Sequence, residues 1–159
     1  MQIDIIAIGK LKESYWRDAQ TEYVKRLSRF SGIQIKEIAE ERISENASDQ
    51  DEENGKQKEG QRILGFISKQ NTNIVLDLSG RTPDSPQLAK MFQDWMNHGK
   101  SHFSFIIGGS NGLSAEVVQS ADYVLCLSKL TFPHQMARIV LLEQIYRAMK
   151  IKANETYHK

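Results

Sequence analysis

The stretch FSFIIGGSNGL, residues 103–113, decides the fold of this chain. Its first half is an almost continuous apolar run, which is typical of a strand buried on both faces in a parallel sheet. Gly108, Gly109 and Gly112 then mark a turn, because glycine permits positive φ and lets a ligand approach the backbone closely. A plain tight turn gives the same pattern. The spacing is neither a G-x-G-x-x-G fingerprint nor a P-loop, so a phosphate cradle is not favoured.

Strands and helices are predicted to alternate on both sides of this stretch. Strands are expected at residues 2–8, 33–38, 73–78, 103–107 and 122–127, from short apolar runs that end at turn residues. Helices are expected at 14–30, 48–68, 85–98 and 133–152, with a short one capped by Ser114. In the third of these, Ser85 is the predicted N-cap and Pro86 the first helical residue. This alternation predicts a single α/β domain over residues 1–159, with a mostly parallel sheet flanked by helices.

Composition indicates an ordinary globular protein. The chain has 159 residues, of which 40% are hydrophobic and 26% charged, so it can bury a core without disulfides or metal. Its one cysteine, Cys126, lies in an apolar run and is predicted to pack in the core as a small hydrophobe. No leader peptide or bilayer-spanning run is apparent. We therefore expect a cytoplasmic protein with no membrane association.

Charge is distributed unevenly along the chain. The net charge is only +1, but residues 37–59 carry nine acidic and three basic side chains, and residues 129–159 carry six basic and two acidic ones. A basic C-terminal face would suit a polyanion such as RNA. Two solvated helix faces of opposite sign explain the same pattern, and on charge alone that explanation is preferred.

Three loops follow predicted strands, at residues 78–82, 108–113 and 128–133. Ligands of open α/β sheets bind beyond the carboxyl ends of the strands, so these loops are the candidate site. In the third loop, backbone amides and carbonyls can imitate base pairing with an adenine whose ring contacts Leu130 and Phe132. An ordinary loop before a helix is the simpler interpretation. His134 is either a base, an RNA contact or a local hydrogen-bonding residue, and the histidines show no metal-ligand spacing, so no metal is expected.

The final helix and tail carry further polar residues. Arg138 lies on the predicted helix, while Tyr157, His158 and Lys159 form a polar aromatic tail. Tyrosine and histidine can stack on an unpaired base, and lysine can meet a phosphate. A frayed terminus is the alternative for the tail.

Four segments together resemble one bacterial enzyme family. They are Leu76-Asp77 with Gly80, FIIGGSNGL at residues 105–113, LSKLTFPHQMARIVLLEQIYRA at 127–148, and TYHK at 156–159. In these segments the chain resembles the ribosomal RNA large subunit methyltransferase H family. Its members are small SPOUT-class enzymes that methylate N3 of a pseudouridine in 23S rRNA. The resemblance covers essentially the full chain, although residues 37–58 contribute no diagnostic motif.

The resemblance implies a fold, a cofactor and partners. It implies a C-terminal trefoil knot, which patterning alone would never predict because knots are very rare. It also implies a homodimer that acts on 23S rRNA in the assembled ribosome, not on DNA, with an active site near the subunit interface. The methyl donor, S-adenosylmethionine, would contact Leu76, Gly108, Leu127, Ser128, Lys129, Leu130, Thr131 and Phe132.

Catalysis is the least defined part of the prediction. A pseudouridine N3–H must lose its proton before methylation, and we find no obvious dedicated base. Alignment of the reactants and a basic environment are expected to supply much of the rate. Arg138, Tyr157, His158 and Lys159 are the candidates for that environment and for RNA docking. Two alternatives remain: a SPOUT enzyme for another RNA site, and a non-catalytic nucleotide-binding or ribosome-binding module.

Overall fold

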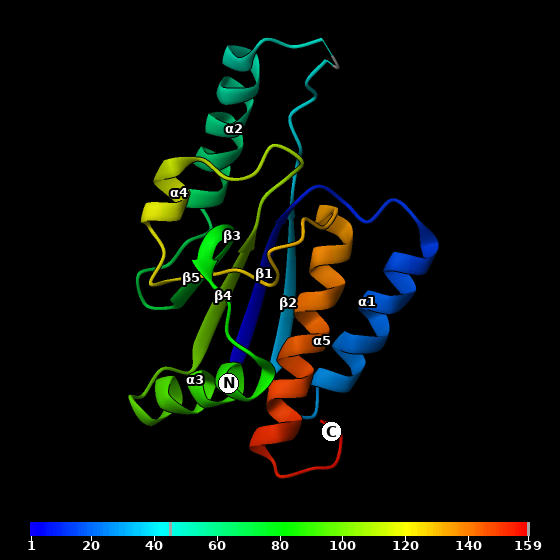
Figure 1. Cartoon of the computed structure of the whole chain (residues 1–159), viewed down its shortest axis with the longest axis vertical. Coiled ribbons are helices and arrows are strands. Elements are labelled where there is room, and N and C mark those ends of the chain that lie inside the picture. Colours follow the sequence, from blue (N-terminus) through cyan, green and yellow to red (C-terminus); the bar gives the residue numbers. More distant parts are fainter. Residues whose placement is uncertain (45, 159) are drawn as a thin grey trace.

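The computed structural model describes residues 1–44 and 46–158 as a three-layer α/β sandwich (Figure 1). Within these residues all strand pairs are parallel and belong to one sheet of order β2-β1-β4-β3-β5. The strands are β1 (Gln2–Ile8), β2 (Gly32–Ile38), β3 (Thr72–Arg81), β4 (His102–Ile107) and β5 (Tyr123–Leu125). The predicted α/β class with a parallel sheet flanked by helices is confirmed.

The helices cover both faces of the sheet. One layer consists of α1 (Ser14–Leu27), α3 (Ser85–Asn97) and α5 (His134–Lys152), and the other of α2 (Asp49–Leu64) and α4 (Ala115–Gln119) (Figure 1). Alternation along β1 divides its side chains between two cores. Ile3 and Ile5 pack under the first layer, and Ile6 and Ile8 under the second. Because both faces are covered, the strands read as continuous apolar runs.

Helix boundaries differ from the prediction by a few residues. The N-cap of α3 is Asp84 and not Ser85, because the Asp84 carboxylate accepts a hydrogen bond from the Gln87 backbone at 2.7 Å. The Gln87 side chain in turn accepts one from the Asp84 backbone, which completes a capping box. Ser48 caps α2 in the same way. The helix predicted to run to residue 30 ends at Leu27, and turns follow it.

Strands β3 and β5 meet in an irregular register. Leu76 and Arg81 both lie opposite Leu125, so residues 77–80 are looped out between them. A Cβ on Gly80 would lie only 2.7 Å from the Val124 backbone, so this looped segment packs directly on β5. The predicted 78–82 loop is thus partly strand, and the predicted 122–127 strand is shorter. The trefoil knot implied by the resemblance stays a prediction.

Among the helices that the structure describes, none is long and apolar enough to cross a membrane.

Candidate functional site

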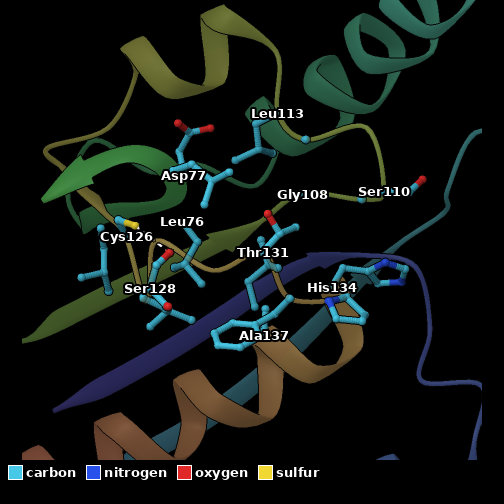
Figure 2. A pocket seen from close by; sticks show the side chains of 18 of the residues that line it. Leu76, Asp77, Gly108, Ser110, Leu113, Cys126, Ser128, Thr131, His134 and Ala137 are labelled. Carbon is cyan, nitrogen blue, oxygen red and sulfur yellow. Dashed lines mark hydrogen bonds between the residues drawn. The ribbon is translucent and has the colours of Figure 1, made fainter. Parts of the chain in front are cut away.

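A cavity of about 650 Å³ opens at the carboxyl edge of the sheet (Figure 2). Its walls come from the second half of β3, from the ends of β4 and β5 with the segments that follow them, and from the first turn of α5. Small-molecule sites occupy roughly 300–1,000 Å³, so this cavity has the size of a nucleoside site. Most of its walls are apolar, and the side chains responsible are Leu76, Leu78, Ile107, Leu113, Leu125, Leu127, Leu130 and Phe132.

The turn after β4 closes tightly because it is built from glycine. Gly112 has φ +79° and donates its backbone N–H to the Gly109 carbonyl at 3.1 Å. A Cβ on Gly108 would lie 2.9 Å from the backbone carbonyl of Gly112. A side chain at Gly108 would therefore force the turn open. The turn presents backbone, rather than side chain, to the cavity.

The segment after β5 is held by local hydrogen bonds. Cys126 donates its backbone N–H to the Arg81 carbonyl at 2.8 Å, and its thiol points to the Ser128 carbonyl at 3.0 Å. The Ser128 hydroxyl accepts the Leu130 N–H at 3.0 Å. This bend leaves Leu130, a cavity-lining leucine, 73% exposed. An apolar side chain held in solvent beside an apolar cavity is suited to cover a ligand.

A sequence profile of the family described as "predicted SPOUT methyltransferase" matches residues 1–158. The chain belongs to this family. SPOUT methyltransferases use S-adenosylmethionine as methyl donor. A solved structure, that of a probable methylase family protein from Haemophilus influenzae Rd KW20, is similar in fold to this SPOUT chain. The two share 12% identity with a TM-score of 0.53, and the match covers 99% of this chain and 70% of the other.

The cavity of this SPOUT chain suits a nucleoside that carries a short charged chain. Apolar walls can enclose an adenine ring, and the backbone of the turns can hydrogen-bond its edge. The Asp77 carboxylate and the Ser128 and Thr131 hydroxyls supply polar groups for a sugar and a cationic centre. Asp77 Oδ1 accepts hydrogen bonds from the backbone N–H and the hydroxyl of Ser79, which orient the carboxylate. The residues present therefore fit S-adenosylmethionine.

The structure brings most of the predicted cofactor residues together. Seven of the eight line the cavity: Leu76, Gly108, Leu127, Ser128, Leu130, Thr131 and Phe132. Lys129 is exposed and does not line it. Their contact with a cofactor stays a prediction. Sequence reasoning did not assign Asp77, Cys126 or Ala137 to the site; Asp77 lies inside β3, one residue beyond the last β3 residue paired with β4.

Arg138 lies behind the cavity and not in its wall. Its side chain is 1% exposed, and its guanidinium donates to the Gly9 carbonyl at 2.8 Å and to Glu37 at 2.6 Å. Arg138 thereby ties the start of α5 to the ends of β1 and β2. The structure gives this predicted catalytic residue an anchoring position, and it is not among the residues that line the cavity; a catalytic role for it stays a prediction.

The tail residues lie at the far end of α5. Tyr157 packs edge to face on Tyr146, with ring centroids 4.9 Å apart, and donates its hydroxyl to Glu143 at 3.2 Å. Burial, with Glu143 next in effect, raises the pKa of the Tyr157 phenol. His158 is exposed, and Lys159 lies outside the described residues. At about 1.5 Å per residue, Tyr146 is roughly 18 Å along the helix from His134. One chain therefore does not bring its own tail to its own cavity.

His134 completes the α5 end of the cavity wall. Its Nε2 atom is shielded from solvent and has no hydrogen-bond partner in the described part of the chain. Burial lowers the pKa of its imidazole; Glu40 opposes this effect, and Arg138 and Lys12 add to it. A buried imidazole nitrogen without a partner is costly, and such groups are frequent at functional sites.

Proposed function

We propose that this chain transfers the methyl group of S-adenosylmethionine to N3 of a pseudouridine in 23S rRNA, on the assembled ribosome. One observation carries the proposal: three loops at the carboxyl edge of the sheet enclose a nucleoside-sized cavity in a chain of the SPOUT family. The RNA site is supported by the resemblance of residues 105–113, 127–148 and 156–159 to the ribosomal RNA large subunit methyltransferase H family.

The cofactor supplies an electrophilic methyl group, and the chain supplies binding and alignment. The glycine turn and the Ser128 bend would hold the adenosyl group by backbone contacts, and the Asp77 carboxylate, which also lines the cavity, would offset the positive charge of the sulfonium. Leu130 and Leu78, which are both largely exposed at the cavity, close over the ligand and exclude water. Aligning the two reactants in this way accounts for much of the rate enhancement in a one-step transfer.

We further propose that the active form is a homodimer. Tyr157 packs on Tyr146, about 18 Å along α5 from His134 at the cavity, so Tyr157 and the neighbouring His158 act only if they serve the cavity of a second copy. The surface of α5 supports this proposal, because Met136, Ile139 and Val140 keep part of their apolar side chains exposed. Burial of such a surface against a second chain is favourable.

A mixed-chain experiment tests the role of the tail. One chain carries Gly108→Ala, which damages the cavity, and the other carries Tyr157→Ala with His158→Ala. At an S-adenosylmethionine concentration far below the Kd of the Gly108→Ala chain, each homodimer is expected to have little activity on ribosomes, whereas co-expressed chains form mixed dimers with one intact site and recover activity. Absence of recovery in mixed dimers that bind S-adenosylmethionine would contradict a tail that serves the partner's site.

The reaction itself is tested by incubating this protein and labelled S-adenosylmethionine with intact ribosomes. The ribosomes come from a strain in which the gene for this protein is deleted. The label is then mapped by mass spectrometry of digested 23S rRNA. We expect it on N3 of a single pseudouridine. Label on tRNA or on another nucleotide would support a SPOUT enzyme for a different RNA site. Cofactor binding without transfer to any RNA would support a non-catalytic module.

A further inference from the structure

Four residues meet behind the α5 end of the cavity: Gly9, Glu40, His134 and Arg138. Gly9 has φ +79°, and its backbone turn brings the chain under the imidazole of His134. A Cβ placed on Gly9 would lie 3.4 Å from His134 Nε2 and 3.6 Å from Glu40 Oε2. The imidazole nitrogen and the carboxylate oxygen therefore converge on one point above Gly9. We call this group the His134 corner.

The corner is held rigidly from below. Arg138 lies one turn after His134 on α5 and donates to the Gly9 carbonyl, so α5 and the end of β1 move together. The Gly9 N–H donates to the Ile38 carbonyl at 2.8 Å, which fixes Gly9 to the end of β2 just before Glu40. These contacts fix the backbone from which His134 and Glu40 extend, and a fixed supporting backbone is suited to a catalytic task that needs defined geometry.

The two ring nitrogens of His134 differ in their surroundings. Nε2 is shielded from solvent and faces Gly9 and Glu40, whereas the side chain as a whole lines the cavity. Figure 2 shows the imidazole at the end of the cavity, on the side of Ser110. A Nε2–H directed at the Glu40 carboxylate would satisfy the shielded nitrogen. That tautomer leaves Nδ1 as the proton-accepting nitrogen on the cavity side.

The environment of the corner favours a neutral imidazole. His134 is the first residue of α5, where the positive end of the helix dipole disfavours a cation. The groups that face it are Glu40 from the β2–α2 segment, Arg138 from α5 and Lys12 from the β1–α1 loop. Burial has the largest effect and lowers the pKa of His134, and only Glu40 raises it. A neutral imidazole can accept a proton near pH 7.

We propose that His134 is the proton acceptor of the methyl-transfer reaction and that Glu40 sets its tautomer. This inference rests on the proposed function, because it needs a substrate whose ring nitrogen carries a proton. The N3–H bond of the base breaks and its proton passes to the imidazole. The freed nitrogen lone pair forms the bond to the methyl carbon, and the electron pair of the broken carbon–sulfur bond stays on sulfur. The imidazolium then releases its proton to solvent.

Single-turnover transfer to ribosomes, measured against pH, tests this role in the intact dimer. His134→Gln is expected to lower the rate at neutral pH by about 100-fold to 10,000-fold, the usual contribution of a general base. The affinity for S-adenosylmethionine, measured by calorimetry, should change less than about threefold, because alignment of the cofactor does not need the proton acceptor. His98→Gln is the matched control, since His98 is exposed at the end of α3 and its ring bonds the Asp94 carbonyl.

A second readout does not depend on activity. Nuclear magnetic resonance of ¹⁵N-labelled imidazoles should show His134 neutral at pH 7 with the proton on Nε2. Glu40→Gln should lower the His134 pKa, because Glu40 raises it, and should move the acidic limb of the rate profile to lower pH by the same amount. The side chain keeps its shape in this variant, so folding is preserved.

The outcomes separate the two hypotheses. If wild-type protein labels a ring nitrogen of 23S rRNA but His134→Gln keeps its rate within about threefold, His134 is not the acceptor and the proposed function stands. His134 is likewise not the acceptor if the acidic limb of the pH–rate profile does not follow the measured His134 pKa. If wild-type protein transfers no methyl group to ribosomes, the proposed function fails first. The expected pattern is loss in His134→Gln with a rate profile that tracks the imidazole.

Discussion

Two buried carboxylates at opposite ends of the strands have opposite pKa shifts: Asp4 on β1, and Glu59, which reaches the carboxyl edge of the sheet from α2. In the amino-terminal half, Asp4 is 3% exposed and lies 2.8 Å from Lys36 Nζ and 3.2 Å from His102 Nε2. Burial alone would raise the pKa of Asp4, but hydrogen bonds from Lys36, Gln2 and His102 outweigh it, and the pKa is lowered. This carboxylate is thus stabilised in its charged form.

At the carboxyl edge, Glu59 is 6% exposed, and fewer hydrogen bonds and positive charges offset the burial of its carboxylate. Its Oε1 accepts the Glu41 N–H at 2.8 Å, and its Oε2 lies 3.4 Å from the position of a Cβ on Gly109. Burial raises the pKa of Glu59; the Glu41 hydrogen bond opposes this, and the charges of Glu40 and Glu41 add to the rise. A poorly compensated acid beneath the glycine turn costs stability where the cavity opens.

The contrast indicates that the two ends of the sheet have different roles, one in stability and the other in ligand binding. One half satisfies its buried charges and supports the fold. The other half keeps glycines and exposed leucines that stability alone would not select, which is the usual signature of a functional edge. Substitutions in the two halves should therefore affect different measurements.

The largest effect is expected from Asp4→Asn. Removing the carboxylate leaves the half-buried Lys36 ammonium without its counter-charge, and should lower the free energy of unfolding by about 2–3 kcal/mol in urea denaturation at pH 7. The affinity for S-adenosylmethionine should not change, because Asp4 is far from the cavity. A loss of affinity as large as the loss of stability would break the division between the two halves.

Gly108→Ala is expected to lower the affinity for S-adenosylmethionine, which Asp4→Asn should leave unchanged. Its Cβ would lie 2.9 Å from the Gly112 carbonyl, and relieving such overpacking costs about 1–3 kcal/mol. Because the turn forms the cavity wall, this cost should appear as an affinity for S-adenosylmethionine reduced by about tenfold to 100-fold in calorimetry. Gly65→Ala is the control, since Gly65 has φ −65° and its Cβ would approach only helix carbonyls, the nearest at 3.3 Å. Equal affinities of the two variants for S-adenosylmethionine would show that the glycine turn is not part of the binding site.

Glu59→Gln is expected to change how the free energy of unfolding depends on pH. A raised pKa means that the folded protein binds a proton more tightly than the unfolded chain, so wild-type stability falls as pH rises from about 4.5 through the folded pKa. The variant lacks this slope and should gain stability relative to wild type between pH 4.5 and 8. Glu52→Gln, exposed on the same helix, should keep the wild-type slope. For Asp4 the sign is reversed, because its contribution is lost as pH falls below 3.8.

The smallest effect is expected from Lys129→Ala. Lys129 is exposed and its side chain does not line the cavity, so the affinity for S-adenosylmethionine should stay within about twofold of wild type. A larger loss would show that the Lys129 side chain contacts the ligand.

Much of the fold was predictable because its signals are local. Apolar runs that end at glycine predicted the buried strands, and cap residues predicted the helices. The choice of Asp84 over Ser85 as N-cap depended on Gln87, which completes a capping box only with Asp84. The central place of β4, between β1 and β3, depends on pairing between distant strands, and no local pattern specifies it.

The sequence predicted the site residues that lie together in one motif. It did not predict contacts between residues that are far apart in the chain. Seven of eight expected cofactor residues line the cavity because they lie in the second half of β3 or just beyond β4 and β5. Arg138 was expected to act on the RNA, since a long basic side chain is normally exposed. Its partners, Glu37 and Gly9, lie 101 and 129 residues away in the sequence, so its burial was not readable from the chain.

The most direct test of the central claim is a crystal structure of this chain with S-adenosylmethionine. We predict the adenosyl group between the Gly108 turn and the segment from Leu127 to Phe132, with Leu130 folded over it. Density for the ligand at another place on the protein, with this cavity holding only solvent, would contradict the account.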